Sequence, residues 1–350
     1  MHVPAYSMIP FVLMLAAIAI FPLFTNKFWD THRNKLYIAL LLAVPTSIWL
    51  IAMGLSSHLY RTMVFDYIPF IILLGSLFVI TGGIFIDGNL KASPGINTLL
   101  LAIGAVLASL MGTTGAAMLM VRPIIQTNKE RNFKVHTILF VIAIIANCGG
   151  LLTPIGDPPL FMMYLRGVDF SWFFRLLPEW LFINSALLAL YFVVDSYFYK
   201  KESTEQKIID EVDIKPIRVS GILNFLWLIG VILAVAFINE QTMPFIKHNE
   251  YFKFLREIVI ALMALFSMMT TAKAIRESNN FNWEPIEEVA YLFFGIFITM
   301  VPCLLYLEQN AASLGVNSPS LFYFASGTLS SFLDNTPTAV TFYTLAQGLV

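Results

Sequence analysis

The sequence predicts an all-α polytopic membrane protein, and its composition is the first reason. Hydrophobic residues make up 58% of the 350 residues, charged residues make up 12%, and the mean hydropathy is +0.77. A soluble domain carries about twice that charged fraction. Several continuous apolar runs approach the roughly 20 residues that a helix needs to cross a bilayer, whereas a transmembrane barrel shows alternating segments of about 10 residues.

The apolar runs predict the membrane elements in chain order. Crossing helices are expected at 8–24, 36–54, 67–86, 172–197, 219–239, 252–272 and 287–306, with a broken crossing at 136–166. Two further segments, 96–126 and 320–350, are pairs of shorter runs that each flank a polar tip. Because one such run is too short to cross alone, we expect two re-entrant hairpins. Their tips must be surrounded by protein or by a watery cavity.

The basic residues predict an orientation. If the N-terminus lies outside, most of the 21 Lys and Arg residues fall in cytoplasmic loops. This arrangement agrees with the positive-inside bias, and it requires both hairpins to be re-entrant. We therefore expect a multi-pass protein of the bacterial inner membrane with its N-terminus outside.

The two halves of the chain predict inverted repeats. The tip at Met111–Thr114 aligns without a gap with the tip at Leu333–Thr336, and an odd number of crossings separates the two repeats. Matching half-length segments of this kind are the best sequence indication of a secondary transporter and of its binding site. We expect a first repeat at 1–198, a cytoplasmic linker at 199–218 and a second repeat at 219–350.

Charge and symmetry give two further expectations. The linker 199–218 is dense in charge, so we expect a solvated connector. The first repeat continues after its hairpin through 136–166 and 172–197, whereas the second stops with its hairpin. By internal symmetry about two elements are absent, and we expect a C-terminally incomplete carrier.

The broken crossing carries residues that open a helix. Proline lacks a backbone N–H, and glycine permits unwinding. The predicted helix-breaking residues are Gly149, Gly150, Pro154, Gly156 and Pro158, joined at the hairpin tips by Gly112, Gly115 and Pro337. Opening the helix frees carbonyl oxygens beside Asn147, Thr153 and Asp157, and oxygen ligands suit a hard cation such as Na+. Helix N-termini at the tips instead favour an anion.

Two carboxylates, Asp157 and Asp334, lie beside helix breaks near the predicted membrane midplane. An ionised carboxylate at that depth costs several kcal/mol unless it is paired or hydrated. Such a group can hold a proton or a cation but scarcely both, which predicts cation/proton exchange. The alternative for Asp157 is an ordinary helix cap.

Neutral polar residues complete the predicted cation and proton site. They are Thr113, Thr114, Asn335 and Thr336. Hydroxyl and amide side chains at helix ends also often only satisfy exposed backbone groups. Arg122 within the first hairpin is a candidate charge partner for the carboxylates or a candidate ligand of an anionic substrate, or its side chain extends to the cytoplasmic interface.

Several function classes are disfavoured. A net charge of −1 gives no indication of nucleic acid binding. The sequence shows no metal-site spacing, phosphate-binding loop or nucleophile motif. We therefore expect no enzyme activity and no cofactor, and the expected partners are the lipid bilayer and small inorganic cations.

Three segments, 146–161, 295–302 and 332–338, resemble a known family. The strings Thr-Pro-Ile-Gly-Asp-Pro-Pro at 153–159 and Phe-Leu-Asp-Asn-Thr-Pro-Thr at 332–338 are similar to those of NhaD-type sodium:proton antiporters and their citrate-transporter-like relatives in the ion transporter superfamily. The resemblance covers nearly the whole chain. It implies inverted repeats with two re-entrant hairpins and two broken helices, a homodimer, and a scaffold domain beside a moving transport domain.

Carried onto matching positions, the resemblance implies that the site residues are Thr113, Thr114, Asn147, Thr153, Asp157, Asp334, Asn335 and Thr336. The second broken helix, where family members place a Gly/Asn-rich cation-binding segment, has no counterpart before residue 350. Dicarboxylate carriers of the superfamily have Ser-Asn-Thr at both tips, whereas this chain has Gly-Thr-Thr and Asp-Asn-Thr. An aspartate at a tip repels a carboxylate and attracts a cation.

These observations favour antiport of Na+ or Li+ against H+ by alternating access. Sodium-coupled transport of citrate, another dicarboxylate or an oxyanion is the alternative within transport. A non-transporting membrane scaffold or a fragment is the alternative from another class.

Overall fold

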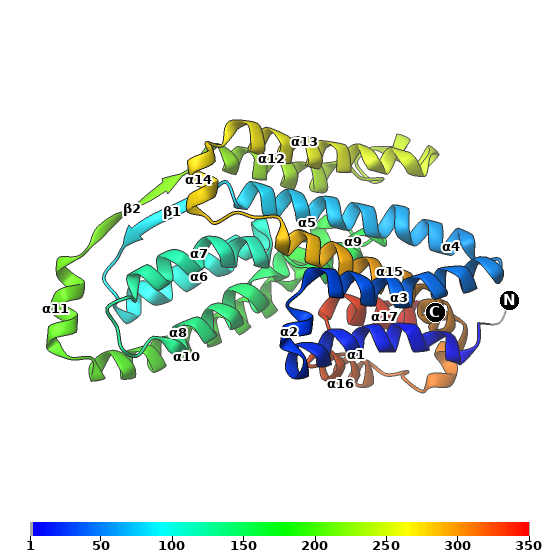
Figure 1. Ribbon diagram of the computed structural model, residues 1–350, viewed down its shortest axis with the longest axis horizontal. Coiled ribbons are helices and arrows are strands. Elements are labelled where there is room, and N and C mark those ends of the chain that lie inside the picture. The colour runs from blue at the N-terminus through cyan, green and yellow to red at the C-terminus, as the bar shows by residue number, and fades with distance from the viewer. Residues whose placement is uncertain (1–2, 350) are drawn as a thin grey trace. The chain divides into compact units, whose positions relative to one another are not determined.

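The computed structural model describes residues 3–349 and confirms the all-α polytopic class (Figure 1). Seven helices in this part of the chain are long and apolar enough to cross a membrane. They are Ala5–Phe24, His32–Ala52, Ser56–Thr81, Pro94–Met111, Val135–Leu152, Phe170–Lys201 and Glu284–Leu314. The predicted spans 219–239 and 252–272 form the shorter helices α12 (Leu223–Phe237) and α13 (Phe254–Thr270).

The chain divides into two compact units, which are described separately. Unit 1 contains the residues up to Ile71 together with those from Asn282 onward, and unit 2 contains Ile72–Phe281. These boundaries differ from those of the predicted repeats, since unit 1 combines the first helices of one repeat with the last helices of the other. The repeat assignment itself stays a prediction.

Unit 1 is built around one long buried helix, α15 (Glu284–Asn310), which packs against α1 (Ile9–Phe24) and α3 (His32–Ala52). The helices pack closely because Gly295 lies against Ala39, where an added Cβ would come within 3.0 Å of the alanine Cβ. Unit 1 also contains α2 (Asn26–Trp29), α4 (Ser56–Arg61) and the start of α5 (Ile68–Thr81).

The second predicted hairpin lies in unit 1 and consists of α16 (Pro319–Ser330) and α17 (Asn335–Gln347). These helices have 12 and 13 residues and rise about 18–20 Å, which is less than the roughly 30 Å hydrocarbon core. Helix α17 packs on both α15 and α16. Val350, the last residue of the predicted hairpin, lies outside the described residues.

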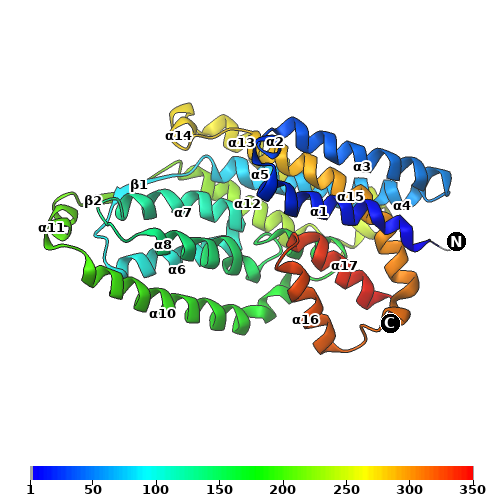
Figure 2. The same cartoon turned by 60° about the horizontal axis from the view of Figure 1, so that its bottom comes forward.

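Unit 2 contains the first hairpin, α6 (Pro94–Met111) and α7 (Thr113–Thr127), which lie side by side (Figures 1 and 2). The expectation that each run is too short to cross a membrane is wrong for α6, whose 18 residues are long and apolar enough for a span. Both hairpins begin in the same way. Ser93 and Ser318 each cap a helix whose first residue is proline, and their side chains accept hydrogen bonds from Ile96 N and Leu321 N. A capping serine followed by proline is a strong helix start, because proline at this position loses no intrahelical bond.

The broken helix follows the hairpin in unit 2. It runs through α8 (Val135–Phe140), a π-helical stretch η3 (Val141–Cys148) and a 3₁₀ turn η4 (Gly149–Leu152), and it resumes as α9 (Pro158–Leu165). The predicted break therefore forms between Leu152 and Pro158. A 3₁₀ turn η5 (Phe170–Leu176) then leads into α10 (Leu177–Lys201).

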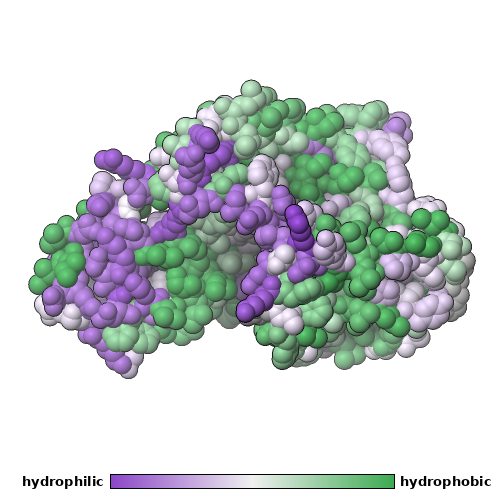
Figure 3. All heavy atoms as spheres, in the orientation of Figure 1, coloured by the Kyte–Doolittle hydropathy of each residue, from purple (hydrophilic) through white to green (hydrophobic). Residues whose placement is uncertain are grey.

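The linker contains regular structure that the sequence did not indicate. It forms α11 (Thr204–Val212) and strand β2 (Lys215–Ser220), which pairs antiparallel with β1 (Phe85–Asn89) in the register Ile86 to Val219. Hydrophilic residues gather on the surface of unit 2 over this end, which carries α11 and the β1–β2 ribbon (Figure 3). The unit ends with α12, α13 and α14 (Lys273–Ser278).

Candidate functional site

The tip of the first hairpin is a one-residue turn at Gly112. Its φ of +82° lies in the left-handed region, which glycine adopts without a steric cost. Helix α6 ends directly before it, at Met111, and α7 begins directly after it, at Thr113. Gly115, near the start of α7, lies against Thr81, where an added Cβ would come within 2.7 Å of the threonine Cγ2. The tip is therefore held close to α5.

Glycine also permits the close backbone approach at the helix break. A Cβ on Gly156 would lie 2.0 Å from Gly150 O, and a Cβ on Gly150 would lie 2.6 Å from Gly156 O. Gly149 packs on α6, where an added Cβ would lie 2.8 Å from the Cβ of Ala108. Pro154 is buried within the break, and Pro158 starts α9. Gly150 and Gly156 thus form a tightly packed backbone crossing within the break.

The hairpin tip and the helix break are joined by five hydrogen bonds, one of them from Leu152 N to Ser109 Oγ at 3.3 Å. Thr113 N donates to Gly156 O at 2.9 Å, and Thr113 Oγ1 donates to Asp157 Oδ1 at 3.0 Å. Thr153 Oγ1 donates to Ser109 O at 2.5 Å, and Ser109 Oγ donates to Gly149 O at 2.5 Å. The structure therefore brings together three predicted site residues, Thr113, Thr153 and Asp157, and adds Ser109.

Asp157 occupies the N-cap position of α9 without making a capping side-chain bond. A capping side chain normally accepts from the N–H of the second or third helical residue. Here the first two helical residues are Pro158 and Pro159, which have no N–H, and Leu160 N donates to the Asp157 carbonyl instead. The Asp157 carboxylate is thus available to the Thr113 hydroxyl at the hairpin tip.

Donors within the protein already satisfy several backbone carbonyls freed by the break. Gly149 O accepts from both Ser109 Oγ and Trp180 Nε1, the latter at 2.8 Å, and Cys148 O accepts from Asn184 Nδ2 at 3.3 Å. These carbonyls are therefore weaker candidates for cation ligands than the sequence suggested. The side-chain oxygens of Asp157 and Thr113 are the stronger ones.

The second tip places its carboxylate differently. Asp334 is the N-cap of α17, and its Oδ1 accepts from Thr336 N at 2.8 Å. Asn335 is exposed and accepts a bond from Ser330 Oγ, whereas Thr336 and Pro337 are buried. The cap interpretation considered for Asp157 thus describes Asp334. Because Asp157 belongs to unit 2 and Asp334 to unit 1, their mutual arrangement stays a prediction.

Three other predicted residues lie away from these contacts. Asn147 and Thr114 have exposed side chains, in η3 and α7 respectively. The Arg122 guanidinium lies over the Phe85 ring, with its Cζ 5.7 Å from the ring centre. This contact places Arg122 beside β1, at the end of unit 2 that the charge bias assigns to the cytoplasm, and it favours the interfacial interpretation.

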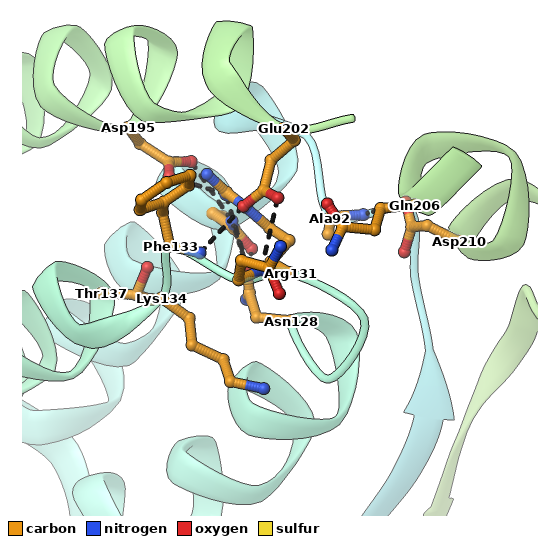
Figure 4. A network of polar contacts seen from close by, with 12 residues as sticks. Ala92, Asn128, Arg131, Phe133, Lys134, Thr137, Asp195, Glu202, Gln206 and Asp210 are labelled. Atoms are coloured by element: carbon orange, nitrogen blue, oxygen red, sulfur yellow. Dashed lines mark hydrogen bonds and ion pairs between the residues drawn. The ribbon is translucent and has the colours of Figure 1, made fainter. Parts of the chain in front are cut away.

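A buried ionic network at the base of the hairpin was not predicted (Figure 4). Arg131 Nη1 lies 2.7 Å from Asp195 Oδ1, and Arg131 Nε lies 3.7 Å from Glu202 Oε1. His136 Nε2 lies 2.7 Å from the same Asp195 oxygen, and Asn97 Nδ2 donates to Asp195 Oδ2 at 3.3 Å. Asp195 has no exposed surface. Its position inside the predicted span 172–197 was the available signal, because an ionisable residue there requires a partner.

Four buried residues of α10 face the interior of unit 2. They are Trp180, Asn184, Tyr191 and Asp195, and their spacing of four and seven residues places them on one helical face. Trp180 and Asn184 bind carbonyls at the helix break, Tyr191 lies 3.1 Å from the Thr137 hydroxyl, and Asp195 binds the Arg131 network. Helix α10 is therefore attached to the broken helix by polar contacts, which are effective between helices in lipid.

Membrane-length helices, two helical hairpins and a helix broken at a buried glycine crossing define the class as an all-α polytopic membrane protein. The family model CitMHS_2, described as "Putative citrate transport", matches residues 1–350. The chain belongs to this citrate-transporter-like family, which confirms the resemblance found in the sequence, and the family is one of secondary transporters. No curated protein matches the chain.

Proposed function

We propose that the protein exchanges Na+ or Li+ for protons, with Asp157 as the carboxylate that holds either ion. The observation that supports this proposal most directly is the 3.0 Å hydrogen bond from the Thr113 hydroxyl to the Asp157 carboxylate, where the hairpin tip meets the helix break. A carboxylate at a helix break favours a cation or a proton. Protonation of Asp157 releases the cation, and cation binding expels the proton.

The second tip supports cation exchange over anion transport. An anionic substrate would bind most readily at a helix N-terminus, where backbone N–H groups and the helix dipole favour negative charge. At α17 the Asp334 carboxylate already accepts the Thr336 N–H and supplies that negative charge. A substrate carboxylate would be repelled there, whereas a cation would be attracted.

Sodium-coupled citrate transport is the second candidate, because the family model is described by citrate transport. In this case Asp157 and Thr113 would hold the coupling cation, and citrate would bind elsewhere. The two candidates share the cation site and differ in the movement of protons and of citrate.

The test is a measurement in everted membrane vesicles that contain the full-length protein. We expect Na+ or Li+ to dissipate an imposed proton gradient at neutral and alkaline pH, and we expect Asp157→Asn to abolish this response. Asp87→Asn, at an exposed position of β1, is the matched control and keeps the response. Accumulation of labelled citrate without a proton response to Na+ would replace antiport by the second candidate.

Asp334→Asn separates a charge role from a capping role. Asparagine caps a helix about as well as aspartate, so α17 is retained in this variant. Loss of exchange with unchanged thermal stability would assign Asp334 to ion handling, and unchanged exchange would leave it as a cap alone.

A further inference from the structure

Two of the linker's carboxylates are buried, whereas large apolar side chains of its helix α11 are exposed. Glu202 and Asp210 are buried, whereas Ile208, Ile209 and Val212 of α11 are exposed. Most of the linker 199–218 is exposed, in keeping with the predicted solvated connector, and the two buried carboxylates are the departure from it. Ionic and hydrogen-bonding contacts therefore hold the linker against unit 2, and the apolar face of α11 takes no part in holding it.

Glu202 binds the loop that joins the hairpin to the broken helix. Its Oε1 accepts from Phe133 N at 2.9 Å, and its Oε2 accepts from Asn132 N at 3.3 Å. Both of these loop residues are exposed. The amides of an exposed loop ordinarily bind water. Their bonds to Glu202 therefore form only while the linker lies against this loop.

Asp210 and Asp213 bind the other side of the hairpin base. Asp210 Oδ2 accepts from Ala92 N at 2.9 Å, just before α6 begins. Asp213 accepts from Asn89 Nδ2 through its carbonyl at 2.8 Å and its carboxylate at 3.2 Å, and it also pairs with Lys129. The linker thus contacts the chain both before α6 and after α7.

Arg131 connects these contacts to α10. It lies between Asp195 of α10 and Glu202 of the linker, and its guanidinium carbon lies 5.5 Å from the centre of the Tyr199 ring. The side chains of Arg131, Asp195 and Glu202 are 3%, 0% and 1% exposed (Figure 4). Separating one member of such a buried group from its partners leaves an uncompensated charge. The network therefore disfavours any movement of the linker away from Arg131 and α10.

A capping box orients α11 for this role. Ser203 Oγ accepts from Gln206 N, and Gln206 Oε1 accepts from Ser203 N, both at 3.3 Å. These reciprocal bonds fix where the helix begins, directly after Glu202. The start of α11 determines which of its side chains face the hairpin, and Asp210 is one of them.

We propose that residues 202–213 form a clasp in which Glu202, Asp210 and Asp213 hold the base of the α6–α7 hairpin, with Arg131 as the cation that Glu202 shares with Asp195 of α10. The linker, the hairpin base and the start of the broken helix then behave as one body. Glu202 and Asp210 are positioning residues, because they act on the site only through the hairpin that carries Thr113. The clasp goes beyond the proposed function and does not depend on which ion is transported.

Hydrogen–deuterium exchange of the full-length protein in detergent tests the clasp without any transport measurement. We expect slow exchange at Asn132 and Phe133 in the wild type, although both residues are exposed. Glu202→Ala should raise the exchange rate there by about ten-fold or more, and Asp210→Ala should do the same at Ala92. Glu205→Ala, at an exposed position of the same helix, is the matched control and changes neither rate.

A conservative variant distinguishes positioning from general destabilisation. Glu202→Gln keeps an acceptor oxygen for Phe133 N and should restore part of the protection that Glu202→Ala loses. Wild-type exchange at Asn132 and Phe133 as fast as in a free loop would overturn the proposal even if no variant folds. Equal acceleration throughout unit 2 in Glu202→Ala would also overturn it, because the clasp predicts a local effect.

Discussion

At the scale of single residues, hydrogen-bond partners separate two aspartates that look alike in the sequence. Both precede a helix, but Asp334 caps its helix through Thr336 N, whereas Asp157 accepts from the Thr113 hydroxyl. The difference follows from the next residues, since Pro158 and Pro159 offer no N–H to cap. Proline therefore directs Asp157 toward the hairpin tip.

The bond from Thr113 to Asp157 gives the first prediction. Thr113→Val removes the hydroxyl at nearly constant shape, and a hydrogen bond to a charged group contributes about 1.5–3 kcal/mol. The Na+ concentration for half-maximal proton release in vesicles should rise about ten-fold or more. Thr114→Val, at the neighbouring exposed position, should leave it unchanged. Equal effects of the two substitutions would count against a role for the hydroxyl.

Asp210 gives a prediction about pH and stability. Burial raises the pKa of this carboxyl above its ordinary value, despite the opposing bond from Ala92 N. The contribution of Asp210 to stability is therefore largest below the ordinary pKa and falls as the pH rises through the raised value. Asp210→Asn keeps an acceptor for Ala92 N and removes this dependence. Its melting temperature should exceed that of the wild type at neutral pH, and the difference should vanish in acid.

Asp213 is the control of opposite sign. The bond from Lys129 lowers the pKa of the Asp213 carboxyl, so its contribution is present above the ordinary pKa and is lost in acid. Asp213→Asn should lower the melting temperature at neutral pH. If both asparagine variants shifted the melting temperature in the same direction, the assigned pKa shifts would be wrong.

At the scale of elements, the site depends on close backbone packing between a hairpin and a broken helix. Gly112 turns the hairpin with a positive φ, and Gly150 and Gly156 cross with their backbones in contact. Ser109 and Thr153 then bond the hairpin to the break. Small residues and hydroxyl groups are effective here, because packing and hydrogen bonds drive helix association in lipid.

The glycine crossing predicts a large difference between two Gly→Ala substitutions. In Gly156→Ala the new Cβ would lie 2.0 Å from Gly150 O, and a backbone atom cannot move aside as a flexible side chain can. We expect a loss of about 1–3 kcal/mol or more, measured as a lower melting temperature. Gly95→Ala, in the first turn of α6 with nothing within 4 Å of the new Cβ, should be neutral or slightly stabilising. Similar melting temperatures for the two variants would contradict the crossing.

At the scale of the whole molecule, the described chain combines membrane-length helices with two helical hairpins, and α6 of the first hairpin is itself one of the membrane-length helices. Seven described helices meet the length and hydropathy of a membrane span. The exposed surfaces of α10 and α12 are rich in large apolar side chains, such as Phe182, Val193 and Leu226, as expected for lipid contact. Hydrophilic residues of unit 2 gather instead toward the end that carries α11 and the β1–β2 ribbon (Figure 3).

The orientation inferred from the basic residues can be tested on the intact molecule. Glu205 in the linker should lie in the cytoplasm, and Thr242 in the loop between α12 and α13 should lie outside. Both residues are exposed, and both native cysteines, Cys148 and Cys303, can be replaced by alanine first. An impermeant thiol reagent applied to whole cells should label Thr242→Cys and spare Glu205→Cys. The reverse labelling pattern would show that every loop lies on the side of the membrane opposite to the predicted one.

The sequence by itself determined the fold class, the family, both hairpins and the position of the helix break. These features were readable because a membrane requires each spanning segment to satisfy its own backbone, so apolar length and the placement of glycine and proline carry the information locally. The tertiary structure alone decided the partners. Thr113 meets Asp157 across 44 residues, and Ala92 meets Asp210 across 118, separations at which no local pattern acts. For the same reason the buried ionic network, with Asp195 and Glu202 on one arginine, became visible only in the folded chain.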